Sequence, residues 1–501
     1  MLFNSFEFIF LYLPIVFLVY FFLIKKKIVI GSKVWLILSS LFFYSWWNIV
    51  YLPLIISSVL FNFVLTRKIF EIAGNKGNLF TKKRLLLIGL IFNIGLLGYF
   101  KYMDFFIFNI NMLTSSQIDF LHLALPLGIS FYTLQQIAYL VDSYEGLVKR
   151  KSFLDYSLFV LFFPQLIAGP IVHYKEVMPQ FASLQNKILN YKNIILGMFI
   201  FSIGLFKKVV LADTFATWVH KGYDTEYILS FLDSWTATLA YTFQLYFDFS
   251  GYTDMAIGVA LLFNIKLPQN FNSPLKATGM IDYWKRWHIT LTNFITSYIY
   301  TPIVRSFTPL TFNKAMLATI IVFLISGMWH GSGWTFIFWG FLHGTGVVIN
   351  HYWHKKTKIR LPKYIAWFIT FIFLNIGNVF FRSNSFEQAW RILQSMFDTS
   401  SIMVSKDLLI FLHDYHISEK LVDFLRPYSS IDSFVGIGSI FMIIIGFIIV
   451  LSFKNTKELF VQFSTLKVVP IGWFVWSIVL MGFSLMVMSF QTSTEFLYFD
   501  F

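Results

Sequence analysis

The segment IIVFLISGMWHGSGWTFIFWGFLHG, Ile320–Gly344, reads as a pair of membrane-buried helices except for two histidines. His330 lies in strongly apolar surroundings, and glycines and tryptophans flank it on both sides. An ionisable side chain inside a membrane is costly and marks a functional site by default. The glycines Gly327, Gly331 and Gly333 would let a second backbone or a substrate chain approach closely. This combination predicts a buried functional centre around His330.

The composition of the whole chain indicates a polytopic membrane protein. Of its 501 residues, 57% are hydrophobic and only 13% are charged, whereas an average soluble domain carries about 25% charged residues. Four apolar runs, Phe6–Ile24, Trp35–Leu65, Leu85–Phe100 and Ile437–Ser452, approach or exceed the roughly 18 residues that mark a bilayer-spanning helix. We therefore expect an all-α protein with about ten to twelve spans.

The formal net charge of +14 comes from short basic clusters between apolar runs, and such clusters are retained on the cytoplasmic side of a membrane. The charge therefore indicates topology rather than a nucleic-acid ligand. The clusters are Lys25–Lys27, Lys82–Arg84, Lys149–Lys151, Lys207–Lys208, Lys355–Arg360 and Lys454/Lys457. No basic residue precedes the first apolar run, so we expect a retained helix that enters from outside rather than a cleaved signal peptide. The absence of cysteine excludes disulfides, thiolate metal sites and cysteine nucleophiles.

Two polar regions do not read as spans. Residues 266–313 combine prolines, asparagines and bases with many Trp and Tyr residues, which favours a cytoplasmic-side loop whose short helices re-enter the membrane. Residues 382–432 are mixed and polar, and there we expect an extracytoplasmic loop with short amphipathic helices. Together with the spans they form one integral-membrane domain over residues 1–501.

Two further histidines need an interpretation. His288, in the segment WKRWHIT, is the second candidate for function, and an interfacial residue of a basic, aromatic collar is an equally good interpretation. His343 follows His330 on another face of a continuous helix, and we interpret it as a packed or cavity-lining side chain.

Asp248 and Asp254 are the carboxylates that a membrane helix would not be expected to carry. Their spacing places them on different sides of a straight helix, which favours hydrogen-bonded structural carboxylates over a catalytic pair. A break at Ser250-Gly251 would instead turn both toward one cavity. No carboxylate lies close to His330 in the sequence, and HExxH and HxxxH spacings are absent, so a metal site is not predicted.

Motifs for several other chemistries are missing. The chain contains no GxSxG, GxxxxGK[ST] or GxGxxG, so nucleophile elbows, phosphate cradles and dinucleotide folds have no support. A low dielectric disfavours an imidazolium, and a neutral His330 in a dry cavity can accept the proton of a hydroxyl that attacks an activated acyl group. The residues are therefore compatible with acyl transfer.

Motifs along the chain resemble those of the membrane-bound O-acyltransferase (MBOAT) family, and within it the bacterial branch of alginate O-acetyltransferases, peptidoglycan O-acetyltransferases and the teichoic-acid D-alanyl transfer protein. In chain order they are MLFNSFEFIFLYLPIV, WLILSSLFFYSWWN, LPLGISFYTLQQIAYLVDSYEG, FFPQLIAGPIVHYKEVMPQF, GLFKKVVLAD, YTFQLYFDFSGYTDMAIGVALLFNIKLPQNFNSP, DYWKRWHITLTNF, GMWHGSGWTFIFWGFLHG and FLYFDF. The resemblance implies a ring of about eleven membrane helices around a central funnel or tunnel, with re-entrant and short interfacial helices.

The resemblance also implies roles for individual residues. His330, in the WHG piece, matches the catalytic histidine of the family, and His288, in WKRWH, matches the second motif histidine. Lys285, Arg286 and Lys276 are the expected cofactor-binding residues, whose charges would attract the phosphates of coenzyme A at the cytoplasmic mouth of the tunnel. For each of them, a topological role as a basic residue retained on the cytoplasmic side is an equal interpretation. The residues expected to line the cavity are Trp329, Gln244, Asp248, Asn270 and His343.

The activity that the resemblance implies is the passage of an acetyl group from cytoplasmic acetyl-CoA across the bacterial inner membrane, without a tightly bound cofactor. A periplasmic partner of the SGNH type would place the acetyl group on an envelope polysaccharide, either peptidoglycan or an alginate-like exopolysaccharide. D-alanyl transfer to teichoic acid is the alternative within the family. A transporter or flippase of an acyl carrier, with the histidines as a proton relay, and a non-catalytic scaffold are the alternatives outside it.

One stretch departs from the family pattern. After WKRWHIT the acetyltransferase branch usually continues as LSxFLRDYLYIPLGG, whereas this chain reads LTNFITSYIYTPIVRSF. The missing Arg-Asp and di-glycine concern the donor loop and the substrate, and they leave His288 and His330 unaffected.

Overall fold

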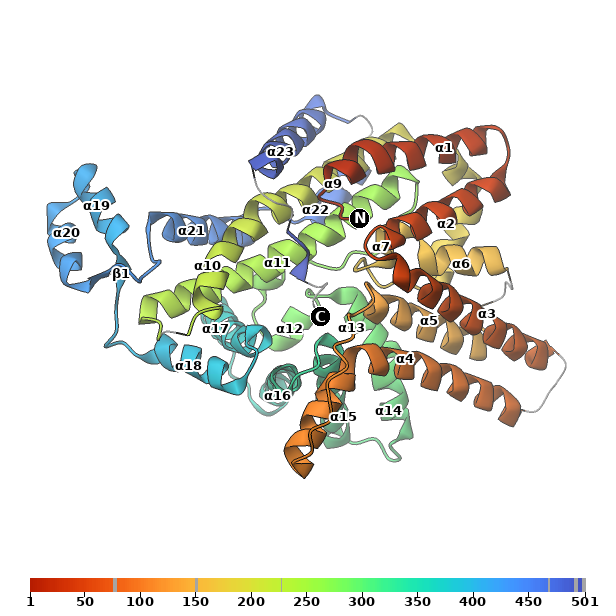
Figure 1. Cartoon of the computed structure of the whole chain (residues 1–501), viewed down its shortest axis with the longest axis horizontal. Helices are drawn as coiled ribbons and strands as arrows, with labels where there is room; N and C mark the ends of the chain where they lie inside the picture. Colours follow the sequence, from red (N-terminus) through yellow and green to blue (C-terminus); the bar gives the residue numbers. More distant parts are fainter. Residues whose placement is uncertain (75–78, 149–151, 227, 467–468, 491–493, 498–501) are drawn as a thin grey trace.

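The computed structural model describes residues 1–74, 79–148, 152–226, 228–466, 469–490 and 494–497. In these residues the chain consists of helices and loops with one pair of two-residue strands, β1 (Val404–Ser405) and β2 (Ser429–Ser430), which run parallel (Figure 1). The basic cluster Lys149–Lys151 and residues 498–501 of the closing FLYFDF piece lie outside the described residues.

The first half of the chain ends with its longest buried helix, α11. Its elements are η1 (Phe8–Tyr12), α1 (Leu13–Lys25), α2 (Val29–Ser45), η2 (Ile49–Tyr51), α3 (Leu52–Gly74), α4 (Leu79–Thr114), α5 (Ile129–Tyr144), α6 (Phe153–Leu161), α7 (Phe163–Leu166), α8 (Tyr174–Ala182), η3 (Leu184–Lys187), α9 (Tyr191–Phe206), η4 (Lys207–Ala212), α10 (Asp213–Tyr223) and α11 (Phe231–Leu262).

The second half begins with short helices and continues with two long antiparallel ones. Its elements are η5 (Pro274–Lys276), α12 (Met280–Trp284), α13 (Ile289–Ile295), η6 (Thr296–Tyr300), α14 (Thr301–Ser306), α15 (Phe312–His330), α16 (Trp334–Lys356), α17 (Lys363–Arg382), α18 (Phe386–Phe397), α19 (Lys406–Asp414), α20 (Glu419–Leu425), η7 (Arg426–Tyr428), α21 (Ile437–Ser452), α22 (Thr456–Thr465) and α23 (Ile471–Phe490).

Seven helices of the described chain are long and apolar enough to cross a membrane, and α21 with α22 makes up to eight if this bent pair is one span. The seven are Phe8–Lys25, Ile49–Ile72, Leu79–Thr114, Tyr191–Tyr223, Phe312–His330, Lys363–Arg382 and Ile471–Phe490. The sequence-based count of about ten to twelve is higher. It includes α2, which has only 17 residues, and the interior helices α5 and α11, whose apolar runs carry buried polar side chains.

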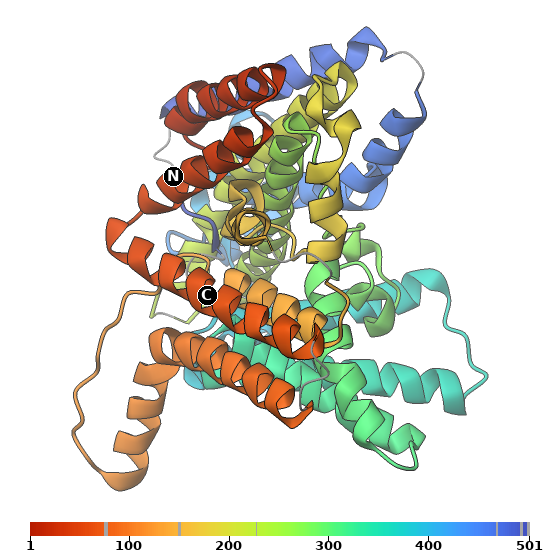
Figure 2. The same ribbon diagram turned by 90° about the vertical axis from the view of Figure 1, so that its right-hand side faces the viewer.

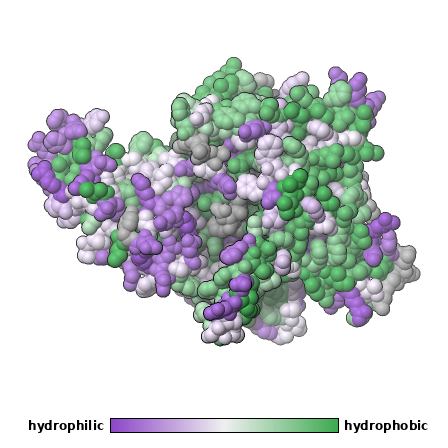
Figure 3. Space-filling model, in the orientation of Figure 1, coloured by the Kyte–Doolittle hydropathy of each residue, from purple (hydrophilic) through white to green (hydrophobic). Residues whose placement is uncertain are grey.

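Hydrophobic residues cover the outside of the spans. Figure 3 shows them over the α1–α4 side of the molecule, while hydrophilic residues gather around α18–α20 and at the opposite end, near the α3–α4 connection. This pattern is typical of a protein whose middle faces lipid and whose two ends face water.

The helix α11 forms the inside of the protein. Nearly all of its side chains are buried, and it packs against α9, α10, α17, α18 and α21. Figures 1 and 2 show it enclosed by other helices from two directions. The α9–α11 crossing is close because a Cβ on Gly204 would lie 2.6 Å from the carbonyl oxygen of Gly251. Small residues at such crossings are what membrane helix packing requires.

Two lysines in the middle of one span form ion pairs with Asp254 and Asp248 of α11. Lys207 Nζ lies 2.6 Å from Asp254 Oδ2, and Lys208 Nζ lies 2.8 Å from both Asp213 Oδ1 and Asp248 Oδ1. The structure therefore corrects the interpretation of Lys207–Lys208 as a cytoplasmic loop, because both lie in the continuous segment of α9, η4 and α10. It also shows α11 unbroken, so Asp248 and Asp254 are ion-paired structural carboxylates.

The end of the described chain packs against the same ion pairs. The backbone N–H of Leu497 donates to Asp248 Oδ2 at 3.0 Å, and the carbonyl oxygen of Glu495 accepts from Lys208 at 2.8 Å. The ring of Phe496 is 1% exposed and lies 4.5 Å from that of Tyr252. Phe496 is therefore part of the protein interior, while Thr494 and Glu495 are exposed.

The region 382–432 forms short helices, α18 to α20, at one end of the molecule (Figure 1). The helices α19 and α20 carry a small apolar core of their own, separate from the main one. This core consists of Val404, Leu408, Leu412, Val422 and Val435. The region 266–313 also forms short helices, α12 to α14 with η5 and η6.

Candidate active site

The hairpin of α15 and α16 places His330 in the interior. A Cβ on Gly327 would lie 2.4 Å from the carbonyl oxygen of Phe336, and a Cβ on Gly340 would lie 2.4 Å from that of Phe323. Only glycine permits this approach, so these two positions bring the helices into backbone contact. The helix α15 ends at His330 itself, which fixes the imidazole at the turn of the hairpin.

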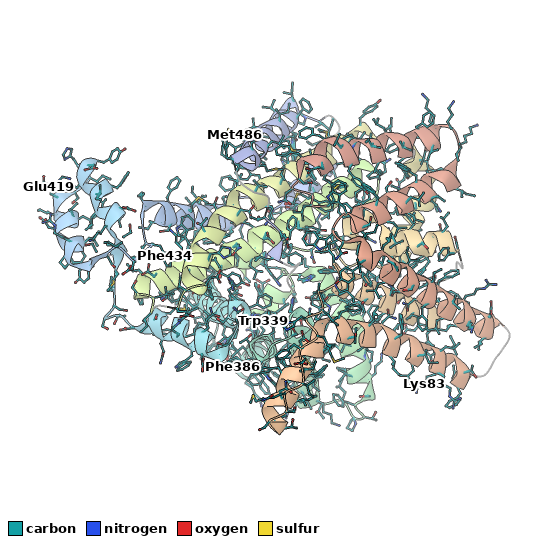
Figure 4. All side chains as sticks on the ribbon, in the orientation of Figure 1. Lys83, Trp339, Phe386, Glu419, Phe434 and Met486 are labelled. Atoms are coloured by element: carbon teal, nitrogen blue, oxygen red, sulfur yellow. The ribbon has the colours of Figure 1, made fainter. Side chains whose placement is uncertain are left out.

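Aromatic side chains enclose His330. Its ring centroid lies 4.9 Å from that of Trp329, 5.1 Å from Trp339 and 5.3 Å from Phe381, and the residue is 1% exposed. Figure 4 shows Trp339 deep in the molecule, far from the labelled residues Lys83 and Glu419 at its two ends. The imidazole therefore lies in an apolar, aromatic environment from which bulk water is excluded.

His288 lies next to His330. Its ring centroid is 6.5 Å from that of His330, and the residue is 0% exposed. It caps α13 in the left-handed region, with φ 42° and ψ 52°. A non-glycine residue in this region costs of order 1 kcal/mol or more, and such strain is concentrated at functional sites. The structure thus brings together the two histidines that the sequence singled out.

Asn270 fixes the tautomer of His288. The backbone N–H of Thr290 donates to Asn270 Oδ1 at 3.1 Å, so this atom of the amide must be the oxygen. The same oxygen lies 3.1 Å from His288 Nδ1, which must therefore carry the proton and donate. A neutral His288 then has its lone pair on Nε2. Asn270, predicted as a cavity-lining residue, thus orients the ring of His288.

The other predicted cavity-lining residues lie in different surroundings. Gln244 lines an outer cavity described below, and Trp329 packs between His288 and His330. Asp248 is 1% exposed and paired with Lys208, within the buried ion pairs of α11. His343 is 1% exposed, with its ring 4.5 Å from Trp339, and is a packed side chain of the same aromatic cluster.

An outer cavity of about 610 Å³ reaches the turn of the hairpin. It is lined by Gly331 and Thr335 of the turn, by Lys101 of α4 and by Arg382 at the end of α17. Its rim carries an ion pair between Arg382 and Asp224 at 2.6 Å. Partial burial tends to raise the pKa of Asp224, but the hydrogen bond to His220 and the charge of Arg382 outweigh it and hold this pKa below its usual value.

An inner cavity of about 360 Å³ lies along the other part of the same hairpin. Its walls are mainly apolar, and Lys285 and His351 are its basic residues. On α15 it reaches Ser326, one turn before His330, whereas the outer cavity begins at Gly331, directly after His330. Along α15, His330 therefore lies between the residues that line the two cavities. Its imidazole lines neither cavity, because Trp329, Trp339 and Phe381 close around it.

The three predicted phosphate-binding cations differ in their surroundings. Lys285 is exposed and lines the inner cavity. Arg286 donates to Asp282 Oδ1 at 2.7 Å and to the carbonyl oxygen of Asn272 at 3.3 Å. Lys276 donates to the carbonyl oxygen of Phe453 at 3.2 Å. Lys285 is thus the best placed of the three for an anionic ligand at this cavity.

Lys101 is a site residue that the sequence interpretation missed. Its ammonium donates to the carbonyl oxygens of Trp329 and His330, which puts a cation at the backbone of the central histidine. The available signal was a lone lysine directly after the apolar run Leu85–Phe100, without the neighbouring bases of a topogenic cluster. Among the described residues, no group of three or more His, Cys, Asp or Glu side chains is arranged to hold a metal ion.

These features define an integral-membrane protein with a buried histidine pair and two cavities along the hairpin that carries His330. The family model described as MBOAT, membrane-bound O-acyltransferase family, matches residues 77–388. The chain is 45% identical over 495 residues to a peptidoglycan O-acetyltransferase of Helicobacter pylori, which covers 92% of this chain and 90% of that protein. It is 34% identical over 413 residues to the probable alginate O-acetylase AlgI of Pseudomonas aeruginosa, covering 81% and 76%.

A teichoic acid D-alanyltransferase of Streptococcus thermophilus is more distant, at 29% identity over 244 residues, 46% of this chain and 58% of that protein. The chain belongs to the membrane-bound O-acyltransferase family, and it is a multi-pass membrane protein and an acyltransferase.

Replacing Asn270 tests its role in orienting His288. Asn270→Ala removes the common acceptor of Thr290 and His288, and an unsatisfied buried donor costs about 1–3 kcal/mol. We expect turnover to fall about 10- to 100-fold, measured as acyl transfer by the purified protein. Asn264→Ala is the matched control, since Asn264 is a buried asparagine that donates to the carbonyl oxygens of Asn186 and Ile188. It should lower the unfolding temperature with little effect on turnover, and equal losses of turnover in both variants would contradict the assignment.

Proposed function

We propose that this acyltransferase passes an acetyl group from cytoplasmic acetyl-CoA, at the inner cavity, to an acceptor at the outer cavity. The observation that carries the proposal is the buried pair of His330 and His288, with residues that line the two cavities on both sides of His330 along the hairpin. The polysaccharide finally acetylated is peptidoglycan, because the relative named for that activity shares 45% identity over nearly the whole chain. The proposed location is the bacterial inner membrane, where the protein can contact both cytoplasmic acetyl-CoA and an acceptor on the outer side.

The immediate acceptor is a hydroxyl group of an extracytoplasmic SGNH-type partner, which hands the acetyl group to the glycan. This partner is proposed because the outer cavity ends in the protein interior, where a glycan strand has less room than a single loop. An alginate-like polysaccharide is the second candidate, supported by 34% identity to the probable alginate O-acetylase. D-alanyl transfer is less well supported, because that relative matches 46% of the chain.

His330 acts as the base in the proposed reaction. Its neutral imidazole accepts the proton of the acceptor hydroxyl while the hydroxyl oxygen forms a bond to the acetyl carbonyl carbon. The tetrahedral intermediate collapses, the carbon–sulfur bond breaks, and the imidazolium returns the proton to the departing thiolate. The products are an acetyl ester and coenzyme A, and no other reactant is needed. His288, with Nε2 as an acceptor, helps to hold the attacking hydroxyl.

Two indole N–H groups are available to stabilise the intermediate. The Nε1 atoms of Trp329 and Trp339 are buried without a hydrogen-bond acceptor among the described residues, and both rings contact His330. An indole N–H can only donate, so burying it without an acceptor costs free energy. The carbonyl oxygen of a bound acetyl group would supply the missing acceptor, and it would bind more strongly as it becomes an oxyanion.

Replacing His330 tests the proposed chemistry. His330→Ala should retain the unfolding temperature of the native protein within a few degrees and lose about 10²- to 10⁴-fold of its turnover, the range for a lost general base. The measurement is release of coenzyme A thiol from acetyl-CoA, which has no background from this cysteine-free chain.

The control for His330 is His413→Ala, since the side chain of His413 is 69% exposed on α19. Its turnover should stay within twofold of the native value. A second assay measures ester-linked acetate on peptidoglycan in a host that lacks its own glycan O-acetyltransferase. Full acetylation by His330→Ala would refute the enzyme mechanism and favour a scaffold.

Replacing Lys285 tests whether the donor binds at the inner cavity and whether its phosphates contact this lysine. Lys285→Gln should raise KM for acetyl-CoA about 5-fold, because an exposed ion pair with a phosphate is worth about 1 kcal/mol. KM for S-acetyl-N-acetylcysteamine, a thioester without phosphates, should not change. Lys358→Gln, at an exposed lysine outside the cavity, is the control. Equal effects of Lys285→Gln on both donors would exclude a phosphate contact.

A further inference from the structure

A fully engaged ammonium group lies inside the protein at the backbone of His330. Lys101 belongs to the span Leu79–Thr114 and is 9% exposed. Among the described residues it has no carboxylate partner within ion-pair distance. Its three N–H groups have three acceptors, namely the carbonyl oxygen of Trp329, that of His330 at 3.1 Å and Ser130 Oγ at 3.4 Å. This satisfies the complete donor set of a lysine.

The acceptors are the last carbonyl groups of a helix. Carbonyl groups in the last turn of α15 have no partner within the helix and carry the negative end of its dipole. Two consecutive residues of α4 engage three consecutive carbonyls there, since Tyr102 Oη donates to Met328 and Lys101 binds those of Trp329 and His330. Further along α4, Asn109 Oδ1 accepts from the indole of Trp334 at 2.9 Å, so this helix holds both sides of the hairpin turn.

A neutral residue could pack at position 101 without the cost of burying a charge in a membrane protein. The charged group has a structural effect at this position. The ammonium binds the carbonyl groups on either side of the His330 Cα, so the two peptide groups that flank His330 have little freedom to rotate. The imidazole direction follows from this backbone. Lys101 also lines the outer cavity, so it lies on the side from which the acceptor approaches.

We propose that Lys101 is a positioning residue of the acyl transfer, which fixes the backbone of His330 so that the imidazole meets the acceptor hydroxyl. This inference rests on the proposed function, in which His330 is the base. A misplacement of about 1 Å in a catalytic group costs about 100-fold in rate. The loss should appear in kcat, because Lys101 does not line the inner cavity where the donor binds.

The test is chemical rescue in the cysteine-free chain. Lys101→Cys should lower kcat about 100-fold and leave KM for acetyl-CoA within twofold. Alkylation with 2-bromoethylamine converts this single cysteine into an aminoethyl thioether with the length and charge of lysine, and the outer cavity gives access to it. We expect at least half of the native kcat to return, with mass spectrometry confirming complete modification.

The control is Tyr102→Phe, which removes the neighbouring hydrogen bond to Met328 and leaves the carbonyl of His330 bound. It should retain kcat within threefold. Native kcat in Lys101→Cys, or no recovery after complete alkylation, would overturn the positioning role. Parallel losses in Lys101→Cys and Tyr102→Phe that follow their unfolding temperatures would also overturn it.

Amide hydrogen exchange separates this inference from the proposed function. The segment 327–334 should exchange faster in Lys101→Cys and return to the native rate after alkylation, with no substrate present. If the native protein released no coenzyme A, the proposed function would fail, and the exchange result would still decide whether Lys101 fixes the His330 backbone. Unchanged exchange in Lys101→Cys would refute it.

Discussion

A polar group inside this protein has no bulk water to bind, so its position is set by the partner that the protein supplies. Lys207 and Lys208 are held by the carboxylates of Asp254, Asp248 and Asp213. The reaction centre follows the same rule. Asn270 determines which nitrogen of His288 carries the proton. The pairs of Lys207 with Asp254 and of Lys208 with Asp248 join separate helices, so both the fold and the site depend on satisfied buried groups.

The hairpin of α15 and α16 organises the reaction centre around His330. Its glycine contacts bring the two helices together, and residues on either side of His330 line cavities of about 610 Å³ and 360 Å³. The imidazole is enclosed by aromatic rings, which keeps water from an activated acyl group. A hydroxyl and a thioester that approach from opposite ends of the hairpin would therefore meet at one buried base.

The sequence was sufficient for features that depend on local pattern. Apolar runs predicted the helical membrane fold, and the isolated His330 among glycines predicted a buried centre with close helix contact. The structure was needed for pairings between distant segments. Lys207 and Lys208 looked like a cytoplasmic loop because their partners on α11 are not visible in the local pattern. The roles of Lys101 and Asn270 depend on carbonyl and amide groups, which every chain contains and no motif marks.

The central claim is that His330 separates two cavities that open to opposite faces of the membrane. The most direct test places single cysteines in the cysteine-free chain, Thr292→Cys in the inner cavity and Ser332→Cys in the outer one. An impermeant maleimide should label Ser332→Cys from the outer face of intact spheroplasts, and Thr292→Cys only in inverted vesicles. Labelling of both cysteines from the same face would contradict the account.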